Sequence, residues 1–370
     1  MKTHLVVYFT RGVSLQIWDE VGMFEREVAL YRRLQHRGVQ VHFVTYGDAA
    51  DLRYAERIQG MGIVCNRWGL PERWYARLIS HLYPLVWRGS AVFKSNQIQG
   101  ADVAMQAARR CGKRFIARCG YLYSEFMERE HGSDSAQANQ ARALEQRVLA
   151  SADRVVVTTR AMQDAVVQRY QVPLDRIVVI PNYVDTDLFH PNPDVGGRSR
   201  RICFVGRLDE QKNPLALLEA IKDLDVELVI VGNGPLRGRL REEANLHGLA
   251  VRFLGNVPHR QLPEILNSAA LFILPSHYEG HPKTLLEAMA CGRPVIGTDV
   301  PGIRQLIQHR ETGYLCGTSP EEIRTAIRYV LGNTGLRPHM GRNAREFVVQ
   351  HFALDRVLEL ELAVLAQLVP

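Results

Sequence analysis

Long apolar runs are absent from this chain of 370 residues. No run approaches the roughly 18 apolar residues that a membrane-spanning helix needs. The apolar part of the N-terminal MKTHLVVYFTRG is too short for the core of a secretory signal, and no small-residue cleavage site follows it. These absences predict a cytoplasmic protein, with the inner face of the cytoplasmic membrane as a further place of action.

Cysteine is scarce and scattered. The six cysteines form no CxxC pair and have no histidines at metal-ligand spacing, which argues against a zinc site and a disulfide framework. We expect reduced and mostly buried thiols. The cysteines are Cys65, Cys111, Cys119, Cys203, Cys291 and Cys316.

A glycine fingerprint for dinucleotides is also missing. The first apolar run leads into FTRGVSLQIW, which contains no GxGxxG. A dinucleotide-dependent oxidoreductase is therefore disfavoured, although it stays open as an alternative.

Positive charge is in excess, with a formal net charge of +7. The stretch Arg67–Lys94 holds five cations against the single acid Glu72, and tryptophans and tyrosines lie between them. This mixture suits peripheral contact with an anionic membrane. A fold in which the aromatic side chains pack inward and the charges are simply solvated is the alternative. No nucleic-acid-binding module accompanies the charge, so no nucleic acid is expected as a partner.

Short apolar runs alternate with amphipathic stretches in two successive series, which predicts an α/β protein with two parallel sheets. Met23–Gly38 is a clear helix closed by glycine. Phe189–Arg200 is rich in Pro, Gly and polar residues and predicts a linker between domains 1–188 and 201–348. The expected strands are Leu5–Thr10, Val39–Tyr46, Gly62–Trp68, Ala91–Asn96, Phe115–Cys119, Arg154–Thr159 and Ile177–Asn182, then Arg201–Arg207, Val226–Gly234, Val251–Val257, Leu271–Ser276, Pro294–Val300 and Gly313–Gly317.

The segment EGHPKTLLE predicts an anion site. Glu279 follows the apolar strand Leu271–Ser276, and open parallel sheets bind ligands at the carboxyl ends of their strands. Pro282 suits the first position of a helix. The free amides of Lys283, Thr284 and Leu285 would then face an anion, and Glu287 could reach back toward the same place.

A second strand end supplies cations. After Gly206, the segment GRLDEQK delivers Arg207 and Lys212. An arginine that clamps phosphate oxygens, together with a lysine point charge, would stabilise a departing nucleoside diphosphate without a metal.

In these and further motifs the chain resembles the retaining GT-B glycosyltransferases of family 4 (glycosyl transferases group 1). The resemblance covers most of the sequence, and the order and spacing of the motifs make it specific. The motifs are Gly22 in DEVGMFERE, IPNYVDTDLFHP (Ile180–Pro191), GRLDEQK (Gly206–Lys212), VIVGNGP (Val229–Pro235), FLGNV (Phe253–Val257), the block Glu279–Gly302, and GYLC (Gly313–Cys316).

The resemblance implies two Rossmann-like domains facing across a cleft, with the acceptor on the first domain and the nucleotide-sugar donor on the second. It also implies that the final helical segment 349–370, with a break around His351–Ala353, crosses back to pack on the first domain. The activity implied is retaining, metal-independent transfer of a sugar from a nucleotide-sugar to a hydroxyl of a glycan or lipid-linked acceptor in surface polysaccharide or glycoconjugate synthesis. The motifs do not fix the donor base, and a UDP-sugar is favoured over a GDP-sugar. No cofactor is expected.

Roles carried over from the family fall on particular residues. Arg207 and Lys212 would contact the diphosphate, Glu279 would hold the donor sugar, and Glu287 would accept the ribose hydroxyls. Further donor-binding residues are Gly22, Gly206, Leu254, Asn256, His281, Lys283, Thr284 and Leu285, with the backbone at 254–256 reading the base and Gly22 allowing close approach to the phosphates.

The first half departs from the common family pattern. Many members carry a His-Asp pair after the strand equivalent to Phe115–Cys119, and this chain does not. The acceptor-side candidates are therefore Arg118, Tyr121, Tyr123 and Glu125. In a retaining reaction the departing phosphate itself can accept the proton of the acceptor hydroxyl, so the missing histidine need not abolish activity.

An Asp-x-Asp triplet at Asp185–Asp187 resembles a metal-binding motif of other glycosyltransferases. Its place before the linker instead favours a tight turn, and no metal is predicted. A GT-B epimerase, a phosphorylase and a non-catalytic sugar-nucleotide-binding subunit remain open as functions.

Overall fold

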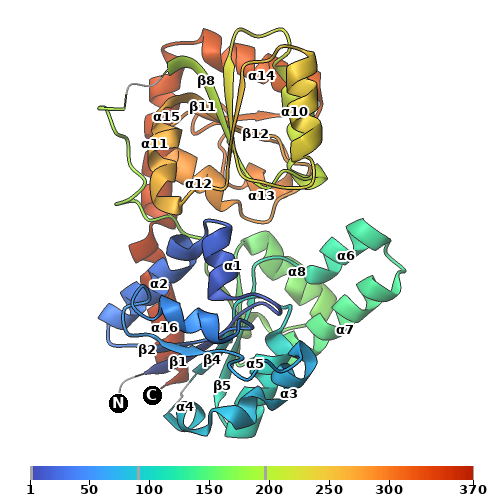
Figure 1. Cartoon of the computed structure of the whole chain (residues 1–370), viewed down its shortest axis with the longest axis vertical. Coiled ribbons are helices and arrows are strands. Elements are labelled where there is room, and N and C mark those ends of the chain that lie inside the picture. The colour runs from blue at the N-terminus through green and yellow to red at the C-terminus, as the bar shows by residue number, and fades with distance from the viewer. Residues whose placement is uncertain (1–2, 90–91, 196–197, 370) are drawn as a thin grey trace. The chain divides into compact units, whose positions relative to one another are not determined.

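A computed structural model describes residues 3–89, 92–195 and 198–369. Ala91 of one expected strand and Gly196–Gly197 of the expected linker lie outside these ranges. Contacts divide the chain into two units (Figure 1). Unit 1 comprises 1–20, 27–181 and 357–370, and unit 2 comprises 21–26 and 182–356. The last residues of the chain thus belong with the first unit.

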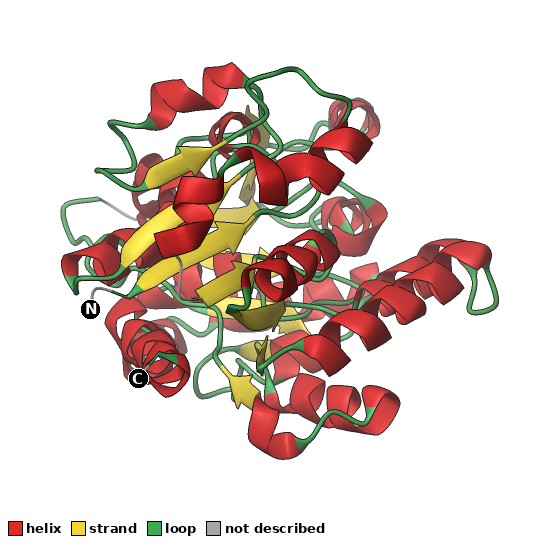
Figure 2. Cartoon of the chain, turned by 90° about the horizontal axis from the view of Figure 1, so that it is seen from below, coloured by secondary structure: helices red, strands yellow, loops and turns green. Residues whose placement is uncertain are grey.

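Unit 1 is built on a parallel sheet of seven strands in the order β3-β2-β1-β4-β5-β6-β7. Its strands are mostly apolar because helices cover both faces of the sheet, as Figure 2 shows. The strands are β1 His4–Tyr8, β2 Gln40–Val44, β3 Gly62–Val64, β4 Val92–Ser95, β5 Arg114–Cys119, β6 Arg154–Val157 and β7 Ile177–Val179.

The helices of unit 1 include a hairpin, α6 and α7, that projects from the rest of the unit (Figure 1). The expected helix Met23–Gly38 is present as α2, and Gly38 closes it with a φ of +86°. The helices are α1 Leu15–Glu20, α2 Phe24–His36, the 3₁₀ turn η1 Ala49–Tyr54, α3 Glu72–Leu82, α4 Pro84–Gly89, α5 Ala101–Cys111, α6 Tyr123–His131, α7 Ala136–Ser151, α8 Arg160–Tyr170, the 3₁₀ turn η2 Leu174–Arg176 and α16 Leu354–Leu368. Helix α16 belongs to unit 1 from residue 357 onward.

Unit 2 is built on a parallel sheet of six strands in the order β10-β9-β8-β11-β12-β13. The first strand begins at Arg198, inside the expected linker Phe189–Arg200, and the remainder of that linker groups with unit 2. The strands are β8 Arg198–Val205, β9 Glu227–Val231, β10 Val251–Gly255, β11 Ala269–Leu274, β12 Val295–Thr298 and β13 Tyr314–Cys316.

The helices of unit 2 bury their apolar faces against this sheet. Helix α14 begins with Pro320 behind a capping box, in which Ser319 and Glu322 satisfy each other's backbone N–H groups. Helix α15 ends at Phe352, so the break before α16 falls within the expected His351–Ala353. The helices are the 3₁₀ turn η3 Glu210–Lys212, α9 Pro214–Ala220, α10 Arg237–Leu246, the 3₁₀ turn η4 His259–Gln261, α11 Leu262–Asn267, α12 Lys283–Ala290, α13 Pro301–Arg304, α14 Pro320–Gly332 and α15 Leu336–Phe352.

Among the described residues, no helix is both long and apolar enough to cross a membrane.

Candidate donor site

The strand order of unit 2 reverses between β8 and β11, and ligands of open parallel sheets bind at such a switch point, beyond the carboxyl ends of the strands. Arg207 and Lys212 follow β8, and Glu279 follows β11. The topology therefore brings together at one edge of the sheet two cations and an acid that stand about seventy residues apart in sequence.

Glycines let the loops after β8 and β9 approach each other closely. A Cβ on Gly232, whose φ is +122°, would lie 2.0 Å from the Gly206 carbonyl oxygen. The Gly206 N–H donates to the Val231 carbonyl at 3.0 Å. The glycine of the VGNGP motif at position 232 is thus needed for the backbone packing of these two loops.

The two cations differ in their surroundings. Arg207 is 71% exposed and lies 3.3 Å from Asp209, so its guanidinium is accessible to a ligand. Lys212 is 17% exposed and forms an ion pair with Glu279. The structure thus brings together Lys212 and Glu279, as the sequence predicts, and leaves Arg207 at the rim.

Glu279 is held from two further directions. The Ser276 hydroxyl donates to Oε1 of Glu279 at 2.7 Å. A Cβ on Gly302, in α13, would lie 2.3 Å from the Glu279 carbonyl oxygen, so α13 packs directly against this loop. The carboxylate therefore occupies a defined position without help from a ligand.

Asn213 connects the loops that follow β11 and β13. Its side-chain amide donates to the carbonyls of Pro275 at 3.2 Å and Thr318 at 3.0 Å, and its φ is +52°.

Helix α12 begins one residue later than the sequence predicts. Pro282 is the N-cap residue, with ψ at 113°, rather than the first helical residue. Its carbonyl accepts from Leu286 N–H at 3.4 Å. The N–H groups at positions 283–285 consequently precede the first intrahelical bond, as expected for an anion site. The Leu285 side chain is buried, so only its backbone can serve a ligand.

His281 and Lys283 flank this helix start and contact the segment after residue 181. The Asn182 amide donates to the His281 carbonyl at 2.7 Å. The Lys283 ammonium lies 5.5 Å from the centre of the Tyr183 ring. Thr284 is half-buried in the first turn of the helix.

Glu287 is 1% exposed. Its Oε1 accepts from His259 Nε2 at 2.8 Å and lies 3.6 Å from Arg26 Nη1. Burial raises the pKa of this carboxyl, but the charges of His259, Arg26 and Lys283 and the His259 hydrogen bond outweigh it, so that the pKa lies below its ordinary value. Glu287 is therefore a carboxylate at neutral pH.

The expected base-reading backbone lies at the end of the adjoining strand. Leu254 and Gly255 end β10, Gly255 has a φ of +69°, and the exposed Asn256 follows. The backbone thus turns sharply at the strand end.

Gly22 belongs to unit 2 by its contacts and has a φ of +75°. A Cβ there would lie 2.4 Å from the Val257 carbonyl oxygen. The close approach that Gly22 permits in this structure is thus to protein backbone.

The Asp185–Asp187 triplet forms the tight turn that its position predicts. Oδ1 of Asp185 accepts from the N–H groups of Asp187 at 3.2 Å and Leu188 at 3.3 Å. Across the described ranges, no group of three or more His, Cys, Asp or Glu residues is arranged to hold a metal ion.

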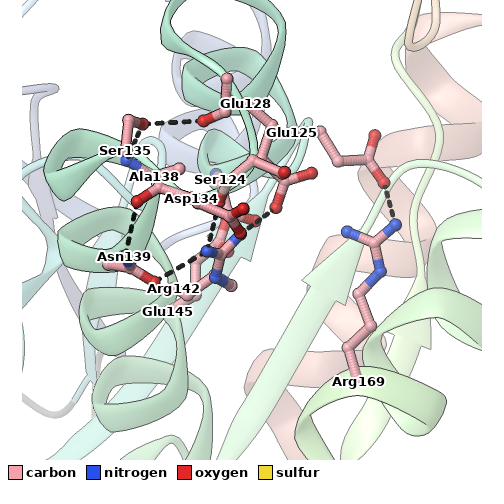
Figure 3. A network of polar contacts seen from close by, with 12 residues as sticks. Ser124, Glu125, Glu128, Asp134, Ser135, Ala138, Asn139, Arg142, Glu145 and Arg169 are labelled. Atoms are coloured by element: carbon pink, nitrogen blue, oxygen red, sulfur yellow. Dashed lines mark hydrogen bonds and ion pairs between the residues drawn. The ribbon is translucent and has the colours of Figure 1, made fainter.

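The acceptor-side candidates lie in unit 1 and differ in availability. Arg118, in β5, donates to the Asn96 carbonyl at 3.3 Å, beside the switch point between β1 and β4. Tyr121 is 38% exposed, and Tyr123 begins α6. Glu125 pairs with Arg169 at 2.9 Å in a polar network around the α6–α7 hairpin, which makes it a structural residue as much as a pocket candidate (Figure 3).

The stretch Arg67–Lys94 lies only partly on the surface. The prediction that its last residue, Lys94, is a surface cation is wrong. Lys94 lies in β4, is 1% exposed and pairs with Glu361. Three of the aromatic residues pack into the core, because they lie on the inner faces of α3 and α4 and in the turn between them: Tyr75, Tyr83 and Trp87. An exposed remainder, the α3 face, consists of Arg67, Trp68, Arg73, Trp74, Arg77 and Leu78.

Two residues of the site, His259 and Arg26, were not predicted from the sequence. His259 lies two residues after the FLGNV motif, and its position just beyond a strand end could have marked it as a candidate for the site. No signal pointed to Arg26, since its approach to Glu287 depends on which unit residues 21–26 join.

Comparisons with known proteins show the family of this chain. The family model for Glycosyl transferases group 1 matches residues 185–347, and that for Glycosyltransferase Family 4 matches residues 27–188. Together the two models span most of the chain, which therefore belongs to the family that they describe.

Individual relatives share part of their length with this chain. An uncharacterized glycosyltransferase of Methanocaldococcus jannaschii is 28% identical over 261 residues, which are 65% of this chain and 64% of the relative. A D-inositol 3-phosphate glycosyltransferase of Acidothermus cellulolyticus is 34% identical over 223 residues, 53% of this chain and 49% of the relative. The matches thus span about half to two thirds of these relatives.

Solved structures share the fold over nearly the whole chain. The sucrose-phosphate synthase of Thermosynechococcus elongatus has a TM-score of 0.81 at 21% identity and covers 99% of both chains. HepE of Anabaena, solved with UDP and glucose, has a TM-score of 0.78 at 17% identity and covers 98% of this chain and 99% of its own.

Proposed function

We propose that this protein is a retaining, metal-independent hexosyltransferase that moves a sugar from a UDP-sugar to a hydroxyl of a glycan or lipid-linked acceptor, in the synthesis of a surface polysaccharide or glycoconjugate. The convergence of Lys212 and Glu279 at the switch point, beside the helix start of α12, carries the proposal. The Anabaena structure with UDP and glucose supports a uridine donor over a guanosine donor.

Each group has a distinct task in this proposal. Lys212, Arg207 and the amides at the start of α12 bind the diphosphate. A lysine has three N–H donors, so Lys212 can keep Glu279 while it donates to a phosphate oxygen. Glu279, held by Ser276, accepts from the hydroxyls of the donor sugar.

The reaction breaks the bond between the anomeric carbon and the β-phosphate oxygen, and the electron pair leaves with the phosphate. The acceptor oxygen forms the new bond on the same face, and its proton passes to the departing phosphate. Lys212 and Arg207 stabilise the negative charge that develops on this phosphate. Electrostatic stabilisation of this kind is usually the largest single contribution to the rate enhancement of an enzyme. The acceptor is assigned to unit 1, near Arg118, Tyr121 and Tyr123.

A peripheral contact with an anionic membrane belongs to the same proposal. On the α3 face, Trp68 is 49%, Trp74 45% and Leu78 38% exposed. The guanidiniums of Arg73 and Arg77 lie 5.9 and 5.8 Å from the Trp74 ring. Exposed indoles beside arginines suit the headgroup region, where a lipid-linked acceptor would be presented.

Calorimetric titration with UDP, GDP and NADH tests the donor site. We expect UDP to bind, and Arg207→Ala to weaken it about tenfold, a loss of about 1.4 kcal/mol. Arg252→Ala is the matched control, because Arg252 is 55% exposed and also paired with an acid, Glu227, but lies on β10 away from the β8 and β11 strand ends. Glu279→Gln should retain UDP but lower turnover of UDP-sugar by about 10² or more.

NADH binding without either nucleoside diphosphate would overturn the proposal in favour of an oxidoreductase. Product analysis distinguishes a transferase from an epimerase and from a phosphorylase. An epimerase returns a nucleotide-sugar and a phosphorylase a sugar phosphate, whereas a transferase releases the nucleoside diphosphate.

A further inference from the structure

The two oxygens of Glu287 have different environments. Oε1 accepts from His259 Nε2 at 2.8 Å and is the oxygen nearer to Arg26 Nη1, at 3.6 Å. Oε2 has no hydrogen-bond partner among the residues that the structure describes. The carboxylate is thus half satisfied, in a residue that is only 1% exposed.

An unsatisfied oxygen of a buried carboxylate is costly, and buried polar atoms normally have a partner. The buried pair of Lys94 and Glu361 also leaves Oε2 of Glu361 unsatisfied, so an unsatisfied oxygen indicates a ligand site only where its surroundings do so as well. Glu287 lies in the second turn of α12, beyond the free amides of the first turn, and its unpaired oxygen belongs to the residue expected to meet the ribose. The missing partner therefore points to a ligand with hydroxyl donors.

His259 determines which oxygen of Glu287 remains without a hydrogen-bond partner in the described structure. The residue opens η4, is 7% exposed and packs its ring 4.9 Å from that of Phe189. Within the described structure its Nδ1 has no hydrogen-bond partner, so the bond from Nε2 is what orients the imidazole. Because a carboxylate oxygen only accepts, Nε2 of His259 is the donor in this hydrogen bond.

We propose that His259 is a positioning residue: by holding Oε1 of Glu287 it leaves Oε2 to accept the ribose hydroxyls of a nucleoside diphosphate, and so sets the preference of the site for a ribose over a sugar that lacks those hydroxyls. The proposal rests on the donor site proposed above and adds a residue to it. Arg26 supplies further positive charge to the same carboxylate.

The test compares UDP with 2′,3′-dideoxy-UDP by calorimetry on the wild type and on His259→Leu, His259→Gln and Glu287→Gln. We expect the wild type to bind UDP about 10- to 100-fold more tightly than the dideoxy nucleotide, as for hydroxyls that donate to a charged acceptor. His259→Leu should lose most of this ratio through weaker UDP binding alone. His259→Gln should keep most of it, because its side-chain amide can donate to Oε1.

Glu287→Gln should abolish the ratio, because the ribose acceptor itself is changed. Equal weakening of both nucleotides in His259→Leu would overturn the inference, because it would show a general structural role. An unchanged ratio in that variant would do the same. If His259→Leu fails to fold, a loss of the ratio in His259→Gln would overturn the inference in its place. A wild type that binds neither nucleotide would remove the donor site and the inference together, which distinguishes the two failures.

Discussion

Lys94 in β4 and Glu361 in α16 form a buried ion pair at 2.5 Å, although 267 residues separate them in the chain. Their side chains are 1% and 2% exposed. Two weaker contacts join the same helix to unit 1: Arg37 with Glu359 at 2.7 Å, and Arg154 with Gln367 at 3.2 Å. The pair thus fastens the last helix of the chain to the first sheet.

Glu361→Ala should destabilise the protein by about 3–5 kcal/mol, because it leaves a buried ammonium without a partner. The double variant Lys94→Met with Glu361→Leu should recover most of the loss, since neither charge is then buried. Urea denaturation measures the free energy of unfolding of both variants. Glu359→Ala is the control on the same helix and should cost about 1 kcal/mol or less, as for exposed pairs. Equal losses at 359 and 361 would contradict the assignment.

Gly302→Ala should reduce turnover about 10²-fold, because the new Cβ would collide with the Glu279 backbone and displace the carboxylate that is proposed to bind the donor sugar. The assay is release of UDP from the donor. Gly332→Ala in α14 is the matched control, since a Cβ there would meet nothing within 4 Å, and it should keep activity and stability. A fully active Gly302→Ala would show that the position of this loop does not limit the reaction.

Acid should destabilise unit 1 through His42. Its imidazole bonds to that of His4 at 2.7 Å, and burial, followed by the charge of His4, lowers the pKa of His42 from 6.5 to about 4. Between these two pH values His42 is protonated in the unfolded chain but not in the folded protein. The free energy of unfolding should therefore fall as the pH drops from about 6.5 toward 4. The thermal midpoint of His42→Gln should decline less over that range than the wild-type midpoint. His131→Gln, at an exposed position, should follow the wild type.

Arg73→Ala with Arg77→Ala should weaken sedimentation with anionic phosphatidylglycerol vesicles about 30-fold. This follows from about 1 kcal/mol for each cation near the surface. Trp74→Ser should weaken it as well, and neutral phosphatidylcholine vesicles should bind poorly. Arg239→Ala with Arg241→Ala, two exposed arginines of α10, is the charge-matched control. If both arginine pairs behaved alike, the α3 face would not be the contact.

Much of the fold follows from the sequence, because buried parallel strands appear as short apolar runs. The thirteen expected strands are all present in two parallel sheets. The placing of Lys212 and Glu279 at one edge of the sheet is equally accessible, since both residues lie in loops after strands that flank a switch point. Such positions depend only on strand order, which the alternating pattern predicts.

Other features depend on contacts that no local pattern encodes. Lys94 appears in the sequence as one more surface cation, because its partner Glu361 lies in the distant C-terminal helix. The two aromatic residues of α3 divide between core and surface according to the phase of the helix, so that Tyr75 is buried and Trp74 exposed. The roles of His259 and Arg26 likewise emerge only once Glu287 is seen to be buried between them.

Asn213 shows how few groups can control the accuracy of such a site. Its one amide spans the loops after β11 and β13, while its own backbone directly follows Lys212. Asn213 thereby helps to set the position of Lys212, the cation proposed to bind the phosphate, relative to the loop that carries Glu279, the acid proposed to bind the sugar. Tolerance to change should therefore be lower at this asparagine than at Arg207, whose exposed side chain can adjust by rotation.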